Sequence, residues 1–154
     1  MRHRSSVMEN SQKRVHLSLP VLERSLLRIN QKLGLAPDAA FVRFVTDAEM
    51  QQLNKKFRNK AKTTDVLSFP SEKRSRPRGL RSRARQLRGV FLGDIAISPT
   101  VARQNGKAFG RSASEEICVL MLHGVLHLLG YDHETDRGEM QRVETKLRGR
   151  LGLS

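Results

Sequence analysis

The segment HGVLHLLGYDH contains three histidines, His123, His127 and His133. Four residues advance a helix by about 6 Å and by about 40° more than one turn, so His123 and His127 share one helix face. Gly130 follows the apolar run, where a left-handed backbone would reverse the chain and return His133 to the same point. Three imidazoles leave the fourth tetrahedral position open, which is typical of a catalytic zinc site. The spacing therefore requires a fold in which a helix, a glycine turn and a third ligand meet at one ion.

Two other interpretations of these histidines compete with a catalytic metal site. Core histidines satisfied by backbone partners would explain one isolated histidine, but not three at this spacing around a glycine. A metalloprotease is the other interpretation, because metzincin proteases share the frame H-E-x-x-H-x-x-G-x-x-H, in which the residue after the first histidine is the general base. Here that residue is Gly124, which cannot accept a proton. The sequence therefore predicts a metzincin-like three-histidine metal site without the proteolytic base.

Hydrophobic periodicity along the rest of the chain predicts an α+β domain. Alternating or short apolar runs predict strands at residues 15–19, 41–45, 65–69 and 90–97. Capping patterns and apolar spacing predict helices over residues 20–34, after Thr46, after Ser98, over 112–129 and around 140–147. This order predicts a single domain in which a four-stranded mixed sheet packs against about five helices. The segment 112–129 is the most apolar helix, so we expect it at the centre.

The length of the chain limits its number of domains, and its charge limits the kinds of partner it can bind. The 154 residues fit one domain, for which we expect a basic tail over residues 1–14 and a catalytic domain over residues 15–154. The net charge of +14 favours a polyanionic partner such as nucleic acid, with an anionic membrane surface as the competing interpretation. No apolar run approaches the roughly 18 residues that a membrane span needs. The single cysteine, Cys118, excludes an intrachain disulfide and favours a reducing, cytoplasmic compartment.

A basic insertion, residues 71–89, separates the last two predicted strands. The insertion contains one acidic residue, Glu72, and eight basic residues, which are Lys73, Arg74, Arg76, Arg78, Arg81, Arg83, Arg85 and Arg88. Mutual repulsion and the cost of desolvation keep such a segment out of a core, so we expect a solvated loop or short helix. We interpret its basic residues from 73 to 85 as substrate-binding groups for phosphates. A solubilising insertion is the alternative.

Four blocks of sequence carry a resemblance to a known family. They are DAEMQQLNKKFR at 47–58, TDVLSFP at 64–70, LGDIAIS at 92–98 and HGVLHLLGYDH at 123–133. In content and order they resemble the YbeY family of metal-dependent endoribonucleases. The resemblance implies one zinc ion per chain, held by His123, His127 and His133, and cleavage of single-stranded RNA. It further implies maturation of the 3′ end of small-subunit ribosomal RNA and ribosome quality control, with the ribosome or small-subunit proteins as partners.

The resemblance also assigns catalytic roles. Arg58 follows the family's L-N-x-x-[YF] pattern, and its planar guanidinium suits both substrate binding and stabilisation of a transition-state phosphate. His123 is expected to be catalytic as a ligand of the metal. Asp65 and Asp94 lie in predicted strands, where either is a candidate to orient a ligand histidine, although capping or pairing explains them equally well. The alternative function is a non-catalytic ribosome-assembly factor that contains a metal and binds RNA.

Overall fold

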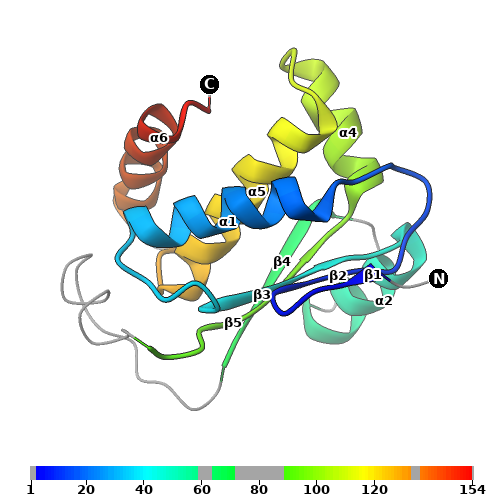
Figure 1. Cartoon of the computed structure of the whole chain (residues 1–154), viewed down its shortest axis with the longest axis horizontal. Helices are drawn as coiled ribbons and strands as arrows, with labels where there is room; N and C mark the ends of the chain where they lie inside the picture. Colours follow the sequence, from blue (N-terminus) through cyan, green and yellow to red (C-terminus); the bar gives the residue numbers. More distant parts are fainter. Residues whose placement is uncertain (1–2, 59–63, 72–88, 133–135, 154) are drawn as a thin grey trace.

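A computed structural model of the chain describes residues 3–58, 64–71, 89–132 and 136–153 (Figure 1). The strands of this part of the chain form one sheet in the order β1-β2-β3-β5-β4. Their bounds are His3–Arg4 for β1, Met8–Asn10 for β2, Ala40–Phe44 for β3, Val66–Pro70 for β4 and Gly93–Ile97 for β5. β2, β3 and β5 run parallel to one another, whereas β1 and β4 run antiparallel to their neighbours. The α+β class and the mixed sheet are therefore confirmed.

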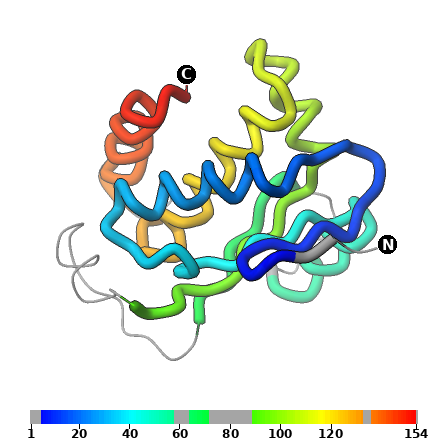
Figure 2. The backbone as a smooth tube through the Cα atoms, viewed as in Figure 1, coloured from blue at the N-terminus to red at the C-terminus, as the bar shows by residue number. Residues whose placement is uncertain are grey.

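The helices lie on both faces of this sheet. The described helices are α1 (Leu19–Lys32), α2 (Asp47–Arg58), α4 (Pro99–Ala108), α5 (Ala113–Leu128) and α6 (Glu139–Leu151). α1 and α5 cross on one side of the sheet, whereas α2 covers the other side (Figures 1 and 2). α5 contacts α1, α4, α6 and the strands β4 and β5, so it is the central helix that the sequence predicts. None of these helices combines the length and apolar character that crossing a membrane requires.

Two helices begin at the capping boxes that the sequence predicts. The backbone N–H of Glu49 donates to the Thr46 hydroxyl over 3.1 Å, and the Glu49 carboxylate accepts from the Thr46 N–H over 3.3 Å. Ser112 and Glu115 make the same reciprocal pair at the start of α5, with both distances 3.1 Å. These bonds satisfy N–H groups that a helix start leaves without a partner, and they fix where α2 and α5 begin.

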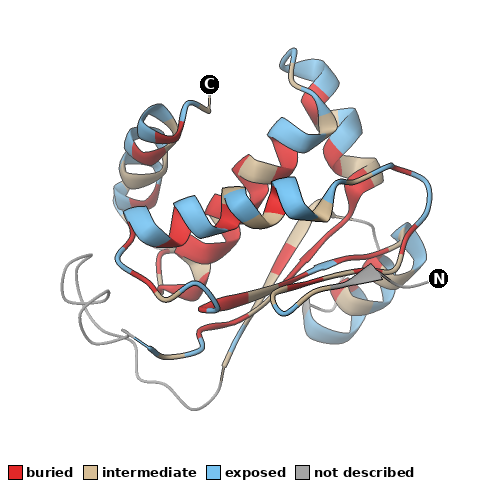
Figure 3. Cartoon of the chain, in the orientation of Figure 1, coloured by how far each residue is buried: buried red, intermediate tan, exposed pale blue. Residues whose placement is uncertain are grey.

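The sheet separates a large core from a small one. Side chains alternate along β5, so Ile95 and Ile97 join the large core beneath α5, while Ala96 joins a small cluster beneath α2 with Val45, Met50 and Leu67. Buried residues accordingly concentrate along α5 and the sheet, whereas the outer surface of α2 is exposed (Figure 3). α5 approaches β5 closely, because a Cβ atom at Gly124 would lie 2.9 Å from side-chain carbons of Ile95.

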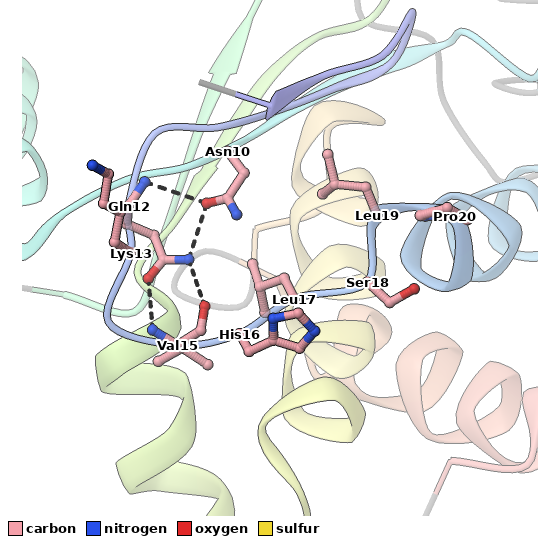
Figure 4. A pocket seen from close by; sticks show the side chains of 9 residues that line it. All are labelled: Asn10, Gln12, Lys13, Val15, His16, Leu17, Ser18, Leu19 and Pro20. Carbon is pink, nitrogen blue, oxygen red and sulfur yellow. Dashed lines mark hydrogen bonds between the residues drawn. The ribbon is translucent and has the colours of Figure 1, made fainter. Parts of the chain in front are cut away.

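The N-terminal segment differs from its prediction. A tail over residues 1–14 is wrong for the described residues, because β2 pairs with β3 in parallel and Met8, opposite Val42, is fully buried. A strand at 15–19 is also wrong. The Gln12 side-chain amide bonds both the N–H and the carbonyl of Val15, over 3.0 and 2.9 Å, and so takes the place of a neighbouring strand (Figure 4). The resulting bend lines a pocket of about 610 Å³ with residues between 10 and 20.

Candidate active site

His123 and His127 lie one helical turn apart on α5 and face each other. Their Nε2 atoms are 3.1 Å apart, and their ring centroids are 4.6 Å apart with the ring planes at 71°. Two nitrogens that bind one tetrahedral zinc ion at about 2.05 Å lie about 3.3 Å from each other. The two imidazoles, both half-buried, therefore already converge as ligands of one ion would.

Glu144 holds the first of these histidines from a neighbouring helix. Its Oε1 atom in α6 lies 3.0 Å from Nδ1 of His123, and both side chains are partly buried, with exposed fractions of 18% for Glu144 and 26% for His123. A carboxylate has only acceptor capacity, so Nδ1 carries the hydrogen and donates a hydrogen bond to Glu144. The lone pair of Nε2 then points away from Glu144 and toward His127. This is the arrangement in which an outer carboxylate fixes the tautomer and orientation of a metal-binding histidine.

The chain reverses after these histidines at the glycine that the sequence singles out. α5 ends at Leu128, and Gly130 has a φ of 98°, in the left-handed region. The N–H of Gly130 donates to the carbonyl of His127 over 2.9 Å, and the N–H of Tyr131 donates to the carbonyl of Leu126 over 3.1 Å. The predicted glycine turn is thus confirmed.

The third predicted ligand, His133, lies outside the described residues. Within the residues that the structure does describe, no three His, Cys, Asp or Glu side chains surround a common point. The structure therefore brings together two of the three predicted ligands, and the role of His133 stays a prediction. The donor set itself suits zinc, because imidazole nitrogens are among its usual ligands.

The strand β4 borders the two histidines. β4 is an outer strand of the described sheet, and its Ser68 hydroxyl donates to the carbonyl of Gly124 over 3.1 Å. Gly124 follows His123 directly, so this bond anchors the helix to the strand at the level of the site. The histidines consequently lie beside the β4 edge of the described sheet.

Neither of the two acids predicted to orient a ligand bonds to His123 or His127, and a contact with His133, which lies outside the described residues, stays a prediction. Asp65 accepts a hydrogen bond from the Asn105 side chain over 3.2 Å instead. Asp94 alternates with Ile95 along β5 and so lies on the sheet face opposite α5. The sequence analysis missed Glu144, although a signal was present: it lies four residues after Met140 and three before Leu147, on the buried stripe of α6, where a carboxylate is unusual.

The other predicted groups lie at the limits of the described structure. Arg58 is the last residue of α2, but its side chain is outside the described part of the molecule. The basic insertion is also outside it from Glu72 to Arg88, so phosphate binding by its residues stays a prediction. Cys118 lies on α5, where burial raises the pKa of its thiol.

Comparisons with known proteins match the chain to one protein family. The family model described as Endoribonuclease YbeY matches residues 7–152. The Endoribonuclease YbeY of Solibacter usitatus is 44% identical over 138 residues, which is 89% of this chain and 82% of that protein. The one from Nautilia profundicola is 42% identical over 85% of this chain and 86% of its own length.

The fold has a match among solved structures as well. The solution structure of TM1509 from Thermotoga maritima is similar with a TM-score of 0.60 at 26% identity, and the match covers 94% of this chain and 87% of that one. The family match begins at residue 7, so it includes β2, which the sequence analysis assigned to a tail.

Proposed function

The chain belongs to the YbeY endoribonuclease family, and from this membership we propose that it cleaves single-stranded RNA with one zinc ion bound by His123, His127 and His133. The single observation that supports the zinc site best is the convergence of two Nε2 atoms to 3.1 Å beside the edge strand. When bound there, zinc would polarise a phosphoryl oxygen and stabilise the charge that develops during cleavage of a phosphodiester.

The protein's own side chains prepare this site. Glu144 accepts a hydrogen bond from Nδ1–H of His123 and keeps the Nε2 lone pair of that histidine turned toward the metal position. The Ser68 hydroxyl in β4 donates a hydrogen bond to the carbonyl of Gly124 in α5. This bond fixes the position of the two histidines along the strand. Preorganisation of this kind lowers the cost of assembling a site when the substrate arrives.

Arg58 and the basic insertion supply the positive groups of the proposal. Arg58 would hold two oxygens of the scissile phosphate with its guanidinium, since it follows the family's pattern at the end of α2. The basic residues from 73 to 85 would bind phosphates farther along the RNA. The net charge of +14 supports both assignments.

The proposed substrate is ribosomal RNA. We infer a role at the 3′ end of small-subunit ribosomal RNA and in ribosome quality control, carried out in the cytoplasm with the ribosome or small-subunit proteins as partners. Membership of the family and the charge of the chain support this assignment. A non-catalytic assembly factor would share the charge, but it would bind RNA without cleaving it.

Removal and return of the metal test the proposed activity. Purified protein is incubated with a labelled single-stranded RNA before chelation, after chelation and after addition of zinc. Cleavage that disappears with the metal and returns with zinc supports the proposal. Tight binding without cleavage in the zinc-loaded protein contradicts it in favour of the assembly factor, and cleavage that survives verified metal removal contradicts the role of zinc.

A further inference from the structure

An exposed phenylalanine stands at the last turn of α2. The side chain of Phe57 is 56% exposed, although a phenyl ring is among the most costly groups to leave in water. Its ring meets that of Phe69 in β4 edge to face, with centroids 4.9 Å apart and planes at 66°. Phe69 packs in turn against the small core beneath α2. Phe57 is therefore held in place by a partly buried neighbour, while more than half of its own side chain stays exposed.

A lysine side chain lies next to the Phe57 ring. The ammonium nitrogen of Lys56 lies 5.3 Å from the centroid of Phe57, and Lys55 beside it is exposed. The acids of α2, Asp47 and Glu49, are confined to its first turn, so the end that carries Phe57 is basic. An exposed aromatic ring with a cation over it suits an unpaired nucleotide, whose base can take the place of the ammonium group on the ring while its phosphate meets that cation.

A chain of contacts through β4 connects the ring to the histidine site. Phe69, which supports Phe57, follows Ser68 in β4, and Ser68 bonds to the carbonyl next to His123. Adjacent residues of a strand point to opposite faces, so the two phenyl rings lie on the α2 face of the outer strand β4 and the histidines lie on its α5 face. An extended nucleic acid strand that crosses this edge would reach both.

We propose that Phe57, supported by Phe69 and accompanied by Lys56, stacks on one unpaired base of the RNA substrate where the strand crosses the β4 edge of the sheet. This inference rests on the proposed function, which it extends from the metal site to a base-binding site. A base within a duplex has both faces covered by its neighbours. The site would therefore favour single strands without reading their sequence.

The chain offers a matched control in Phe109. Its ring is 69% exposed and lies 5.1 Å from the guanidinium carbon of Arg111, so it too combines an open ring with a cation. It stands at the junction of α4 and α5, at the end of α5 far from His127. Loss of Phe109 thus removes the same surface chemistry from a place where the proposal expects no RNA.

Equilibrium binding of a fluorescent single-stranded RNA decamer, verified intact on a gel, tests the inference. Phe57→Leu keeps an apolar contact with Phe69 but loses the aromatic face, so its affinity should fall by roughly 5- to 100-fold. Phe57→Tyr should stay within about twofold of the wild type, because it retains the face. Phe109→Leu should bind like the wild type. Zinc content and thermal unfolding should be unchanged in all three variants.

A decamer with one abasic position, moved along the strand, tests stacking directly. At the position that meets Phe57, loss of the base should weaken RNA binding by the wild type. It should not further weaken RNA binding by Phe57→Leu, because loss of the base and loss of the phenyl ring remove the same contact. Unchanged affinity of Phe57→Leu overturns the inference while leaving the proposed function intact, as does an equal loss in Phe109→Leu. Self-association that Phe57→Leu abolishes would overturn it in favour of an interface between copies. A wild type that binds no single-stranded RNA overturns the proposed function as well.

Discussion

Glu144 in α6 reaches across to α5 and places its Oε1 atom 3.0 Å from Nδ1 of His123. We predict that Glu144→Ala weakens zinc binding by roughly 10- to 100-fold, because His123 loses the acceptor that fixes its tautomer. Glu144→Gln should lose less, since an amide oxygen still accepts from Nδ1–H. Competition with a chromophoric chelator measures both affinities.

Glu139 provides the control for this prediction. It is exposed on the same helix, so Glu139→Gln removes the same charge without touching His123 and should leave zinc affinity unchanged. Equal affinities in Glu144→Ala and the wild type would show that the 3.0 Å contact has no effect on the metal.

Replacement of Arg58 should affect the reaction and not the metal. We predict that Arg58→Ala lowers RNA cleavage by roughly 100-fold or more with unchanged zinc content, because the lost contact is with the transition-state phosphate. Arg58→Lys should recover only part of the rate, since a lysine lacks the planar fork. Single-turnover cleavage assays give these rates. A wild-type rate in Arg58→Ala would exclude a catalytic role, and joint loss of zinc and folding would make the residue structural.

Gly124 is predicted to be required for packing. Gly124→Ala would place a Cβ 2.9 Å from side-chain carbons of the fully buried Ile95, so we expect a loss of about 1–3 kcal/mol in the free energy of unfolding. Gly149→Ala in α6 meets nothing within 4 Å, and it should stabilise by up to about 1 kcal/mol through helix propensity. Urea denaturation measures both. Equal stabilities of the two variants would mean that α5 can move away from β5 at no cost.

The basic insertion should govern the salt dependence of RNA binding. Each neutralised phosphate of a single strand contributes roughly 0.7 to the slope of log affinity against log salt. A short glycine-serine link in place of residues 73–88 should therefore flatten the slope by about two to three, if three or four phosphates are bound. Cleavage at saturating RNA should change little. A slope equal to that of the full chain would identify the insertion as a solubilising or protein-docking element.

Local chemistry made much of the fold predictable. The capping boxes at Thr46 and Ser112 involve partners three residues away, so the sequence displays both members of each pair. The turn at Gly130 is equally local. β2 was not predictable in this way, because three residues are too short to show a period and their partners, beginning with Val42, lie more than thirty positions along the chain.

In the site, too, local features are predictable from the sequence and contacts between distant segments are not. The spacing of His123 and His127 on one helix is local, and their convergence is visible in the sequence. The contact of Glu144 with His123 depends on how α6 packs against α5, which no pattern within either helix specifies. The sequence alone indicates at Gly124 only the absence of a protease base, because the approach of this residue to Ile95 depends on how α5 packs on the sheet.

Zinc content and RNA cleavage measured on one preparation test the central claim most directly, with His127→Ala beside the wild type. The proposed site predicts about one zinc per wild-type chain, loss of that zinc in His127→Ala because two ligands rarely retain the ion, and loss of cleavage in proportion. Full zinc content in His127→Ala, or cleavage at the wild-type rate by the zinc-free variant, would contradict it.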